Sequence, residues 1–296
     1  MRGRTLPFAG HKLDRADTLR ADPARLAALA GPDARLLRLE GLIPRLSDES
    51  CLQWGRCGEL EKGAELVFLG LLDGEALFAA VPADGDVDPA YARQETWAAL
   101  GQLGPEDLAL YGGARSVLDW HARHRFCSRC GGPTRIAKGG WQRDCVSETC
   151  AAQHFPRVDP VTIMLVEHGG RLLLGRSHRF PAGNYSALAG FVEPGESIEE
   201  AVAREVFEEA GVRVRDVAYV GSQPWPFPSQ LMIACHAHAE HDALAIDETE
   251  LEDARWFTAG EIREALESGA ESRSFRAPPR QAIAHHMLHW WLEEQR

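Results

Sequence analysis

The segment 190–212 constrains this 296-residue chain more than any other, because it puts acidic side chains where a helix normally carries apolar ones. A glycine-containing loop precedes a predicted helix over about 197–210. At about 100° per residue, Glu205 and Glu209 fall within roughly 60° of Ile198 and Val202, with Glu208 beside them. A solvated run of charges would put its carboxylates on the opposite face. The pattern therefore predicts carboxylates gathered along the apolar stripe.

Such a cluster needs positive charge nearby. Like charges at i, i+3 and i+4 repel one another, and burial raises carboxyl pKa values unless cations keep the groups ionised. Divalent ions with oxygen ligands are the natural cations, and Mg²⁺ or Mn²⁺ is preferred where phosphates supply the other ligands. We therefore expect a catalytic Mg²⁺ or Mn²⁺ site on this helix. The alternative is an ordinary glutamate-rich surface helix.

Four of the seven cysteines form two close pairs. Cys127 and Cys130 are separated by two residues, Cys145 and Cys150 by four, and 14 residues lie between the pairs. Four soft thiolates at these spacings suit tetrahedral zinc, and a closed four-thiolate site is typical of a structural rather than a catalytic ion. His154 is a spare candidate ligand. The alternative is four unrelated cysteines.

The charge balance bears on which partners the chain can bind. Lys and Arg number 32 and Asp and Glu 44, so the net charge is −12, which works against non-specific binding to a polyanion. Six basic residues between 122 and 144 either offset the negative zinc–thiolate centre or contact RNA. No run approaches the roughly 18 apolar residues of a membrane span, and the first residues lack the long apolar core of a secretory signal. We expect a cytoplasmic protein without membrane partners.

The apolar and turn patterns divide the chain into three parts. Apolar runs at 66–72 and 76–81 predict a hairpin turning at Asp73-Gly74, and runs at 161–166 and 172–174 predict another at Gly169-Gly170. Helices are expected near 94–103, 105–124 and 280–294, and strands near 217–220 and 231–236. We predict a small N-terminal α/β domain over 1–121, a zinc ribbon over 122–156 and an α/β (α+β) layered domain over 157–296.

The carboxylate segment resembles the Nudix box, GX5EX7REUXEEXGU, where U is apolar. It matches at every specified position: Gly190, Glu196, Arg204, Glu205, Val206, Glu208, Glu209, Gly211 and Val212. The resemblance implies a Nudix α/β/α sandwich that hydrolyses a nucleoside diphosphate linked to another group. It also implies divalent ions on Glu205, Glu208, Glu209 and the carbonyl of Ala189, with Arg204 orienting the carboxylates and Glu196 holding the loop. The general base stays open among the three helix glutamates.

A second motif narrows the expected substrate. The run Ser222, Gln223, Pro224, Trp225, Pro226, Phe227, Pro228 resembles the SQPWPFPxS motif of the NADH pyrophosphatase subfamily. It departs at the end, where Ser229-Gln230 puts the serine one position early. Prolines stiffen such a loop, while aromatic faces and polar side chains can contact a nucleotide. The alternative is a proline-rich ligand for an aromatic groove.

The subfamily resemblance implies further site residues and an assembly. Phe155 matches an aromatic residue that lines the nucleotide site, Phe191 is placed to stack on a base, Glu250 aligns with a further metal ligand, and Ala284 aligns with a backbone contact to substrate. Each has a plain alternative in core packing or surface exposure. The subfamily plan also includes a Nudix-like N-terminal domain, the zinc ribbon, here with a wider second cysteine pair, and a homodimer.

These expectations converge on a NAD(H) diphosphatase. It would cleave the pyrophosphate of NADH or NAD⁺ to give AMP and nicotinamide mononucleotide, and subfamily membership also implies removal of NAD caps from RNA 5′ ends. Two alternatives stay open: a broader hydrolase of ADP-ribose or dinucleoside polyphosphates, and a non-catalytic nucleotide sensor with a nucleic-acid-binding ribbon.

Overall fold

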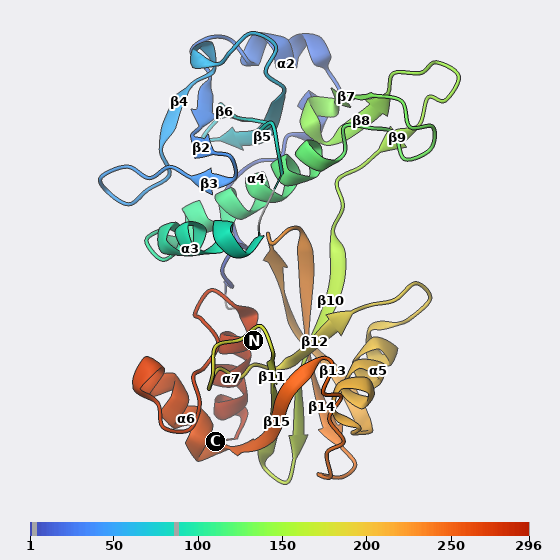
Figure 1. The fold of residues 1–296 in the computed structure, drawn as a ribbon. Coiled ribbons are helices and arrows are strands. Elements are labelled where there is room, and N and C mark those ends of the chain that lie inside the picture. Colours follow the sequence, from blue (N-terminus) through green and yellow to red (C-terminus); the bar gives the residue numbers. More distant parts are fainter. Residues whose placement is uncertain (2–4, 86–88, 296) are drawn as a thin grey trace. The chain divides into compact units, whose positions relative to one another are not determined.

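The computed structural model describes residues 1, 5–85 and 89–295. The chain forms two compact units (Figure 1). The first contains Met1–Pro7, Asp159–Gln223 and Gln230–Arg296, and the second contains Phe8–Val158 and Pro224–Ser229. The residues that join β13 (Val214–Trp225) to β14 (Gln230–Ala239) are therefore assigned to the second unit.

A six-stranded sheet is the centre of the first unit. Five strands follow the order β13-β14-β10-β11-β15, and β12 pairs antiparallel with β10. Strands β14 and β10 are parallel to each other. The predicted turn at Gly169-Gly170 is confirmed, and both glycines have positive φ. The strands are β10 (Asp159–His168), β11 (Arg171–Ser177), β12 (Leu188–Phe191), β13 (Val214–Trp225), β14 (Gln230–Ala239) and β15 (Leu251–Thr258).

Helices cover both faces of this sheet. Successive side chains of a strand point to opposite faces. Accordingly, Met164 and Val166 of β10 share a core with α5 (Ile198–Ala210), while Leu165 shares another with α7 (Ile283–Glu294) and α6 (Ala259–Ser268). In Figure 1, α5 lies on one side of the strands and α6 and α7 on the other. The predicted α/β/α sandwich is confirmed.

The second unit contains a smaller sheet in the order β4-β1-β6-β5. The predicted Asp73-Gly74 turn joins β5 to β6, and both residues have positive φ. The long helix α4 buries Leu108 and Leu118 in a core with Val67 and Leu77 of this sheet. The elements are α1 (Asp17–Arg20), α2 (Pro23–Leu29), β1 (Arg35–Leu37), β2 (Leu39–Glu40), β3 (Ile43–Pro44), β4 (Trp54–Arg56), β5 (Leu66–Leu72), β6 (Glu75–Ala80), α3 (Pro89–Leu100) and α4 (Pro105–Arg123).

The cysteine-rich segment forms a three-stranded antiparallel sheet within the second unit. Its strands are β7 (Thr134–Ala137), β8 (Gln142–Cys145) and β9 (Gln153–His154). Buried Arg143 donates to the Glu65 carboxylate at 2.9 Å, and the Trp141 indole donates to the Phe68 carbonyl at 2.9 Å. These contacts attach the ribbon to the small sheet.

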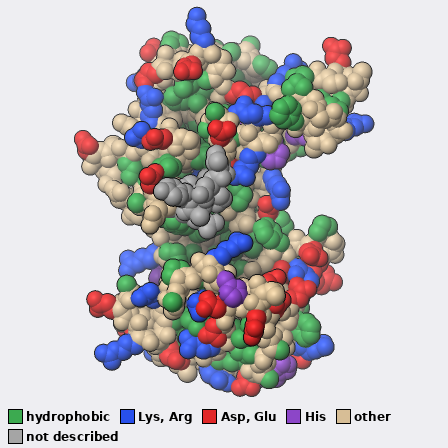
Figure 2. All heavy atoms as spheres, viewed as in Figure 1, with side chains coloured by type: hydrophobic (Ala, Val, Ile, Leu, Met, Phe, Trp, Pro, Cys, Tyr) green, Lys and Arg blue, Asp and Glu red, His purple; other side chains and the backbone are tan. Residues whose placement is uncertain are grey.

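Figure 2 shows how the charged side chains are distributed over one face of the molecule. On the face drawn in Figure 2, acidic and basic side chains are interspersed over each unit, without a broad patch of one sign among the described residues. Within the described ranges, no helix combines the length and the apolar character needed to cross a bilayer.

Candidate active site and zinc centre

Helix α5 has well-defined ends. The Ser197 hydroxyl accepts from the Glu200 backbone N–H at 3.2 Å, and the Glu200 carboxylate accepts from the Ser197 N–H at 2.7 Å, which forms a capping box. Gly211, with φ 69°, ends the helix in the left-handed region that favours glycine. Helix α5 is therefore capped at both ends.

The orientation of the helix confirms the predicted buried glutamates. Glu205 is 9% exposed and Glu209 is 7% exposed, on the face that also buries Val202 and Val206. Glu208 lies at the rim, with a side chain that is 56% exposed. The apolar stripe thus carries two buried carboxylates and one accessible one.

Arg204 organises the loop and the helix. Its guanidinium donates to both carboxylate oxygens of Glu196, at 2.6 and 2.9 Å, and to the Phe191 carbonyl at 2.9 Å. The same side chain donates to Glu205 and Glu208, each at 2.9 Å from Nη1. One nitrogen therefore holds two carboxylates together.

Glu196 fastens the loop that precedes α5. Its Oε2 also accepts from the Glu193 backbone N–H at 2.9 Å. The hydrogen bonds from Arg204, followed by that from Glu193, lower the pKa of Glu196 to about 2. The carboxylate is therefore ionised throughout the physiological range.

Gly190 leaves the space that the Glu205 carboxylate occupies. A Cβ at Gly190 would stand 1.8 Å from the Glu205 Cδ, which is far too close for two non-bonded carbon atoms. Gly190 lies in β12, next to Ala189, and its carbonyl accepts from buried Thr162 at 3.3 Å. The first glycine of the motif is thus required by close approach.

Glu209 is a buried carboxyl without a protein partner for one of its oxygens. Burial first, and then the charges of Glu205, Glu250 and Glu208, raise its pKa to about 8. Its Oε2 is buried and has no hydrogen-bond partner. Burial also raises the pKa of Glu205, against the effect of Arg204.

The oxygen donors of this cluster have the chemistry that a divalent cation prefers. An unpaired buried carboxylate oxygen is costly, and a bound cation is one of the few partners that satisfies it. Glu250 is exposed and lies close enough for its charge to raise the pKa of both Glu205 and Glu209. In this structure the positive charge at the cluster comes from Arg204, and the four glutamates do not form one of the tight ligand groups found among the described residues.

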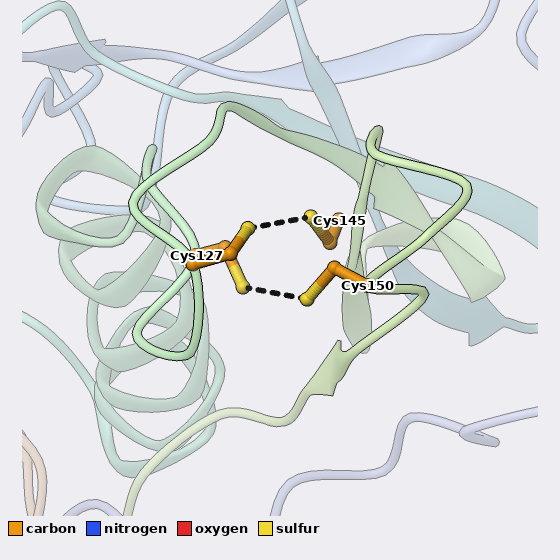
Figure 3. A group of neighbouring side chains, drawn as sticks. Cys127, Cys145 and Cys150 are labelled. Atoms are coloured by element: carbon orange, nitrogen blue, oxygen red, sulfur yellow. Dashed lines mark hydrogen bonds between the residues drawn. The ribbon is translucent and has the colours of Figure 1, made fainter.

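The four cysteines form a tight ligand group. Their sulfur atoms lie within 4.8 Å of one another, with 3.8 Å between Cys127 and Cys150 (Figure 3). The sulfur atoms of Cys130 and Cys145 are 3.4 Å apart. A tetrahedron with zinc–sulfur bonds of about 2.3 Å has edges of about 3.8 Å. His154 Nε2 lies 3.3 Å from the Cys127 sulfur, so the histidine neighbours a set already complete with four thiols. The arrangement fits a structural zinc ion.

Gln223 of the proline-rich motif is fully buried and fully hydrogen-bonded. Its amide donates to the carbonyls of Pro7 and Gln281, at 3.1 and 2.9 Å, and its Oε1 accepts from the Ile283 N–H at 2.8 Å. Ile283 is the first residue of α7. The glutamine side chain therefore holds the start of that helix, and each of its polar atoms is already paired.

The aromatic residues of the motif pack within the second unit. The rings of Trp225 and Phe227 lie 5.4 Å apart, and both approach Trp97, at 5.7 and 5.2 Å. Arg115 donates to the Pro226 carbonyl at 2.9 Å and lies over the Phe227 ring. The sequence did not lead us to Arg115 as a residue that holds this motif. An arginine at a position of α4 where apolar side chains are expected could have indicated it.

The remaining predicted site residues are dispersed over the fold. Phe155 and Phe191 are exposed, at 60% and 52%, so neither packs in a core. Ser222 accepts from the Tyr219 hydroxyl at 3.2 Å, and Ser229 donates to the Arg157 carbonyl at 2.8 Å. The other predicted positions are the exposed Pro224 and Pro228, the half-buried Gln230 at the start of β14, and the buried Ala284 in α7.

Three family models match consecutive parts of the chain. A "NADH pyrophosphatase-like rudimentary NUDIX domain" matches residues 21–120, a "NADH pyrophosphatase zinc ribbon domain" matches 122–155, and a "NUDIX domain" matches 156–277. The second and third contain the cysteine group and the glutamate helix, respectively.

Several curated proteins are similar over most of this chain. NAD-capped RNA hydrolase NudC of Mycobacterium bovis is 41% identical over 266 residues, 86% of this chain and 83% of that protein. The mitochondrial NAD(P)H pyrophosphatase NUDT13 of Mus musculus is 39% identical over 273 residues, 86% of this chain and 76% of that protein. NAD-capped RNA hydrolase NUDT12 of Homo sapiens is 48% identical over 202 residues, 66% of this chain but 44% of that protein. The chain thus spans less than half the length of NUDT12.

Proposed function

This chain belongs to the NADH pyrophosphatase branch of the Nudix family, and from that premise we propose that it hydrolyses the pyrophosphate bond of NAD(H) to AMP and nicotinamide mononucleotide. The observation that carries the proposal is the glutamate cluster of α5, where Arg204 holds Glu205 and Glu208 beside the unpaired oxygen of Glu209. The activities after which the similar proteins are named indicate the substrate class. They also support removal of NAD caps from RNA as a second use of the same bond cleavage.

We assign the divalent site to Glu205, Glu208, Glu209, Glu250 and the carbonyl of Ala189. When bound there, Mg²⁺ or Mn²⁺ supplies a Lewis acid for the phosphate oxygens as negative charge grows on them. Arg204 orients two of these carboxylates, and Glu196 fixes the guanidinium in turn. One of the three helix glutamates accepts the proton of the attacking water.

Recognition of the dinucleotide is assigned to the motif and the exposed aromatic residues. Phe155 and Phe191 present open ring faces, and base stacking on such faces is worth about 1–3 kcal/mol. Within the motif, the buried contacts of Gln223 and Trp225 favour a role in shaping the hairpin that carries Ser222 and Ser229. A homodimer and a cytoplasmic location remain our predictions.

The test is hydrolysis of NADH by the purified zinc-loaded chain with Mn²⁺, with AMP as the measured product. Glu209→Gln removes a carboxyl group that can ionise to bind the cation and is expected to lower kcat/KM by at least about 100-fold. Glu199→Gln is the matched control, because Glu199 is exposed on the first turn of the same helix. Equal activity of the wild type and Glu209→Gln would refute the proposal.

Specificity is tested in the same assay. We expect the highest kcat/KM for NADH or NAD⁺, with ADP-ribose and dinucleoside polyphosphates at least about tenfold lower. The reverse order would favour the broader hydrolase. Tight binding of nucleotide with no turnover of any substrate would favour the sensor.

A further inference from the structure

A second group of potential metal ligands lies in the first unit. Glu167 is on β10 and His236 and His238 are on β14, and one ligand atom from each lies within 4.8 Å of those of the others. In the parallel register, Glu167 pairs with His238 and Leu165 pairs with His236. Residues two apart on a strand share a face, so all three side chains project from the same side of the sheet.

That side is opposite to the glutamate helix. Leu165, which shares the face of Glu167, packs in the core that includes Met287 and Leu288 of α7. Val166, which faces the other way, packs in the core with Val202 of α5. The group is therefore separated from the proposed hydrolytic site by the sheet itself.

The group is already organised. The side chains of Glu167 and His236 are each 16% exposed, and His236 Nε2 lies 3.2 Å from Glu167 Oε2. The Trp291 indole donates to the same oxygen at 2.7 Å. The imidazole rings of His236 and His238 meet edge to face, with centroids 4.9 Å apart.

These contacts match the surroundings of metal ligands in general. A ligating carboxylate is usually oriented by a neighbouring donor, and here the indole of Trp291 uses Oε2 and leaves Oε1 for another partner. The ring of Trp290 lies 5.7 Å from that of His236 and forms an apolar wall. A half-buried site with two nitrogens and one oxygen suits zinc and similar ions, whereas Mg²⁺ prefers oxygen ligands.

We propose that Glu167, His236 and His238 bind one divalent transition-metal ion of the zinc type, independently of the cysteine centre. The ion would join β10 to β14 directly. Trp291 of α7 and Gln295, the residue directly after the end of α7, both contact Glu167. The ion would therefore also fix the end of that helix against the sheet. The rival is a hydrogen-bonded anchor for α7 that needs no ion.

The test titrates Zn²⁺ into the full chain with its cysteine centre already loaded, in excess Mg²⁺ to fill sites made of oxygen ligands. Native mass spectrometry counts bound zinc, and imidazole nuclear magnetic resonance signals report the histidines. We expect one further zinc per chain and changes in two imidazole side chains at one equivalent. His236→Ala combined with His238→Ala should remove the extra zinc, while His241→Ala, an exposed histidine beyond β14, should retain it.

Glu167→Gln is a second variant for the case that the double histidine variant fails to fold. The amide oxygen of its glutamine can still accept a hydrogen bond from the Trp291 indole. We expect at least a tenfold loss of zinc affinity with unchanged NADH hydrolysis in Mg²⁺. Binding of no extra zinc, or unchanged imidazole signals in the wild type, would overturn the proposal in favour of the anchor. Loss of NADH hydrolysis in all samples would instead bear on the proposed function.

Discussion

Glu209→Gln tests whether a buried carboxyl destabilises the metal-free first unit. Burial and the neighbouring glutamates raise the pKa of Glu209 from its ordinary value of 4.5 to about 8. One pKa unit corresponds to about 1.4 kcal/mol, so ionising this group in the folded protein costs about 5 kcal/mol. Glutamine keeps the shape and cannot ionise.

The sign follows from proton binding in the two states. Below pH 4.5 the carboxyl is protonated in both the folded and the unfolded chain, and the group costs nothing. Between pH 4.5 and about 8 the unfolded chain releases the proton while the folded chain keeps it, so the free energy of unfolding falls as pH rises. The wild type should therefore lose about 5 kcal/mol relative to Glu209→Gln across this range.

Urea unfolding at several pH values measures this difference, on zinc-loaded protein dialysed free of Mg²⁺. Glu199→Gln should follow the wild type. Added Mg²⁺ should restore the stability of the wild type at pH 8 by binding the ionised cluster, and should do so far less for Glu209→Gln. Parallel stability curves for the wild type and Glu209→Gln would show that Glu209 does not keep its proton in the folded chain.

Three further changes test other parts of the account. Gly190→Ala should lower kcat by about 100-fold, because a new Cβ displaces the Glu205 carboxylate. Gly113→Ala, whose Cβ meets no neighbour, should leave kcat unchanged, and equal kcat values for the two variants would contradict this. Gln223→Leu leaves buried backbone groups unpaired and should lower the free energy of unfolding by about 3 kcal/mol in urea, and a loss below about 0.5 kcal/mol would show that these bonds are dispensable. Cys150→Ser should abolish stoichiometric zinc in elemental analysis, and full retention would argue against the four-thiol centre.

Local patterns were sufficient for much of the fold. The helical period placed Glu205 and Glu209 on the buried face, and both predicted glycine-containing turns occur, because each depends on residues close in sequence. The cysteine spacing was informative for the same reason. The helix period, the two turns and the cysteine spacing all depend on residues that are close together in the sequence.

Features that depend on long-range pairing were not predictable. Gln223 was expected to contact substrate, and only the folded chain brings its amide to Pro7 and to the start of α7. The group of Glu167 and His238 depends on the parallel register of β10 and β14, which no local pattern specifies. Side-chain type suggested what these residues can do, but tertiary structure decided which partners they have.

The most direct test of the central claim is an anomalous difference map from crystals of the protein soaked in Mn²⁺. We expect Mn²⁺ density at about 2.2 Å from carboxylate oxygens of Glu205 and Glu209, beside the Ala189 carbonyl. Mn²⁺ density elsewhere, with Glu205 still paired to Arg204 and the buried oxygen of Glu209 still without a partner, would contradict it.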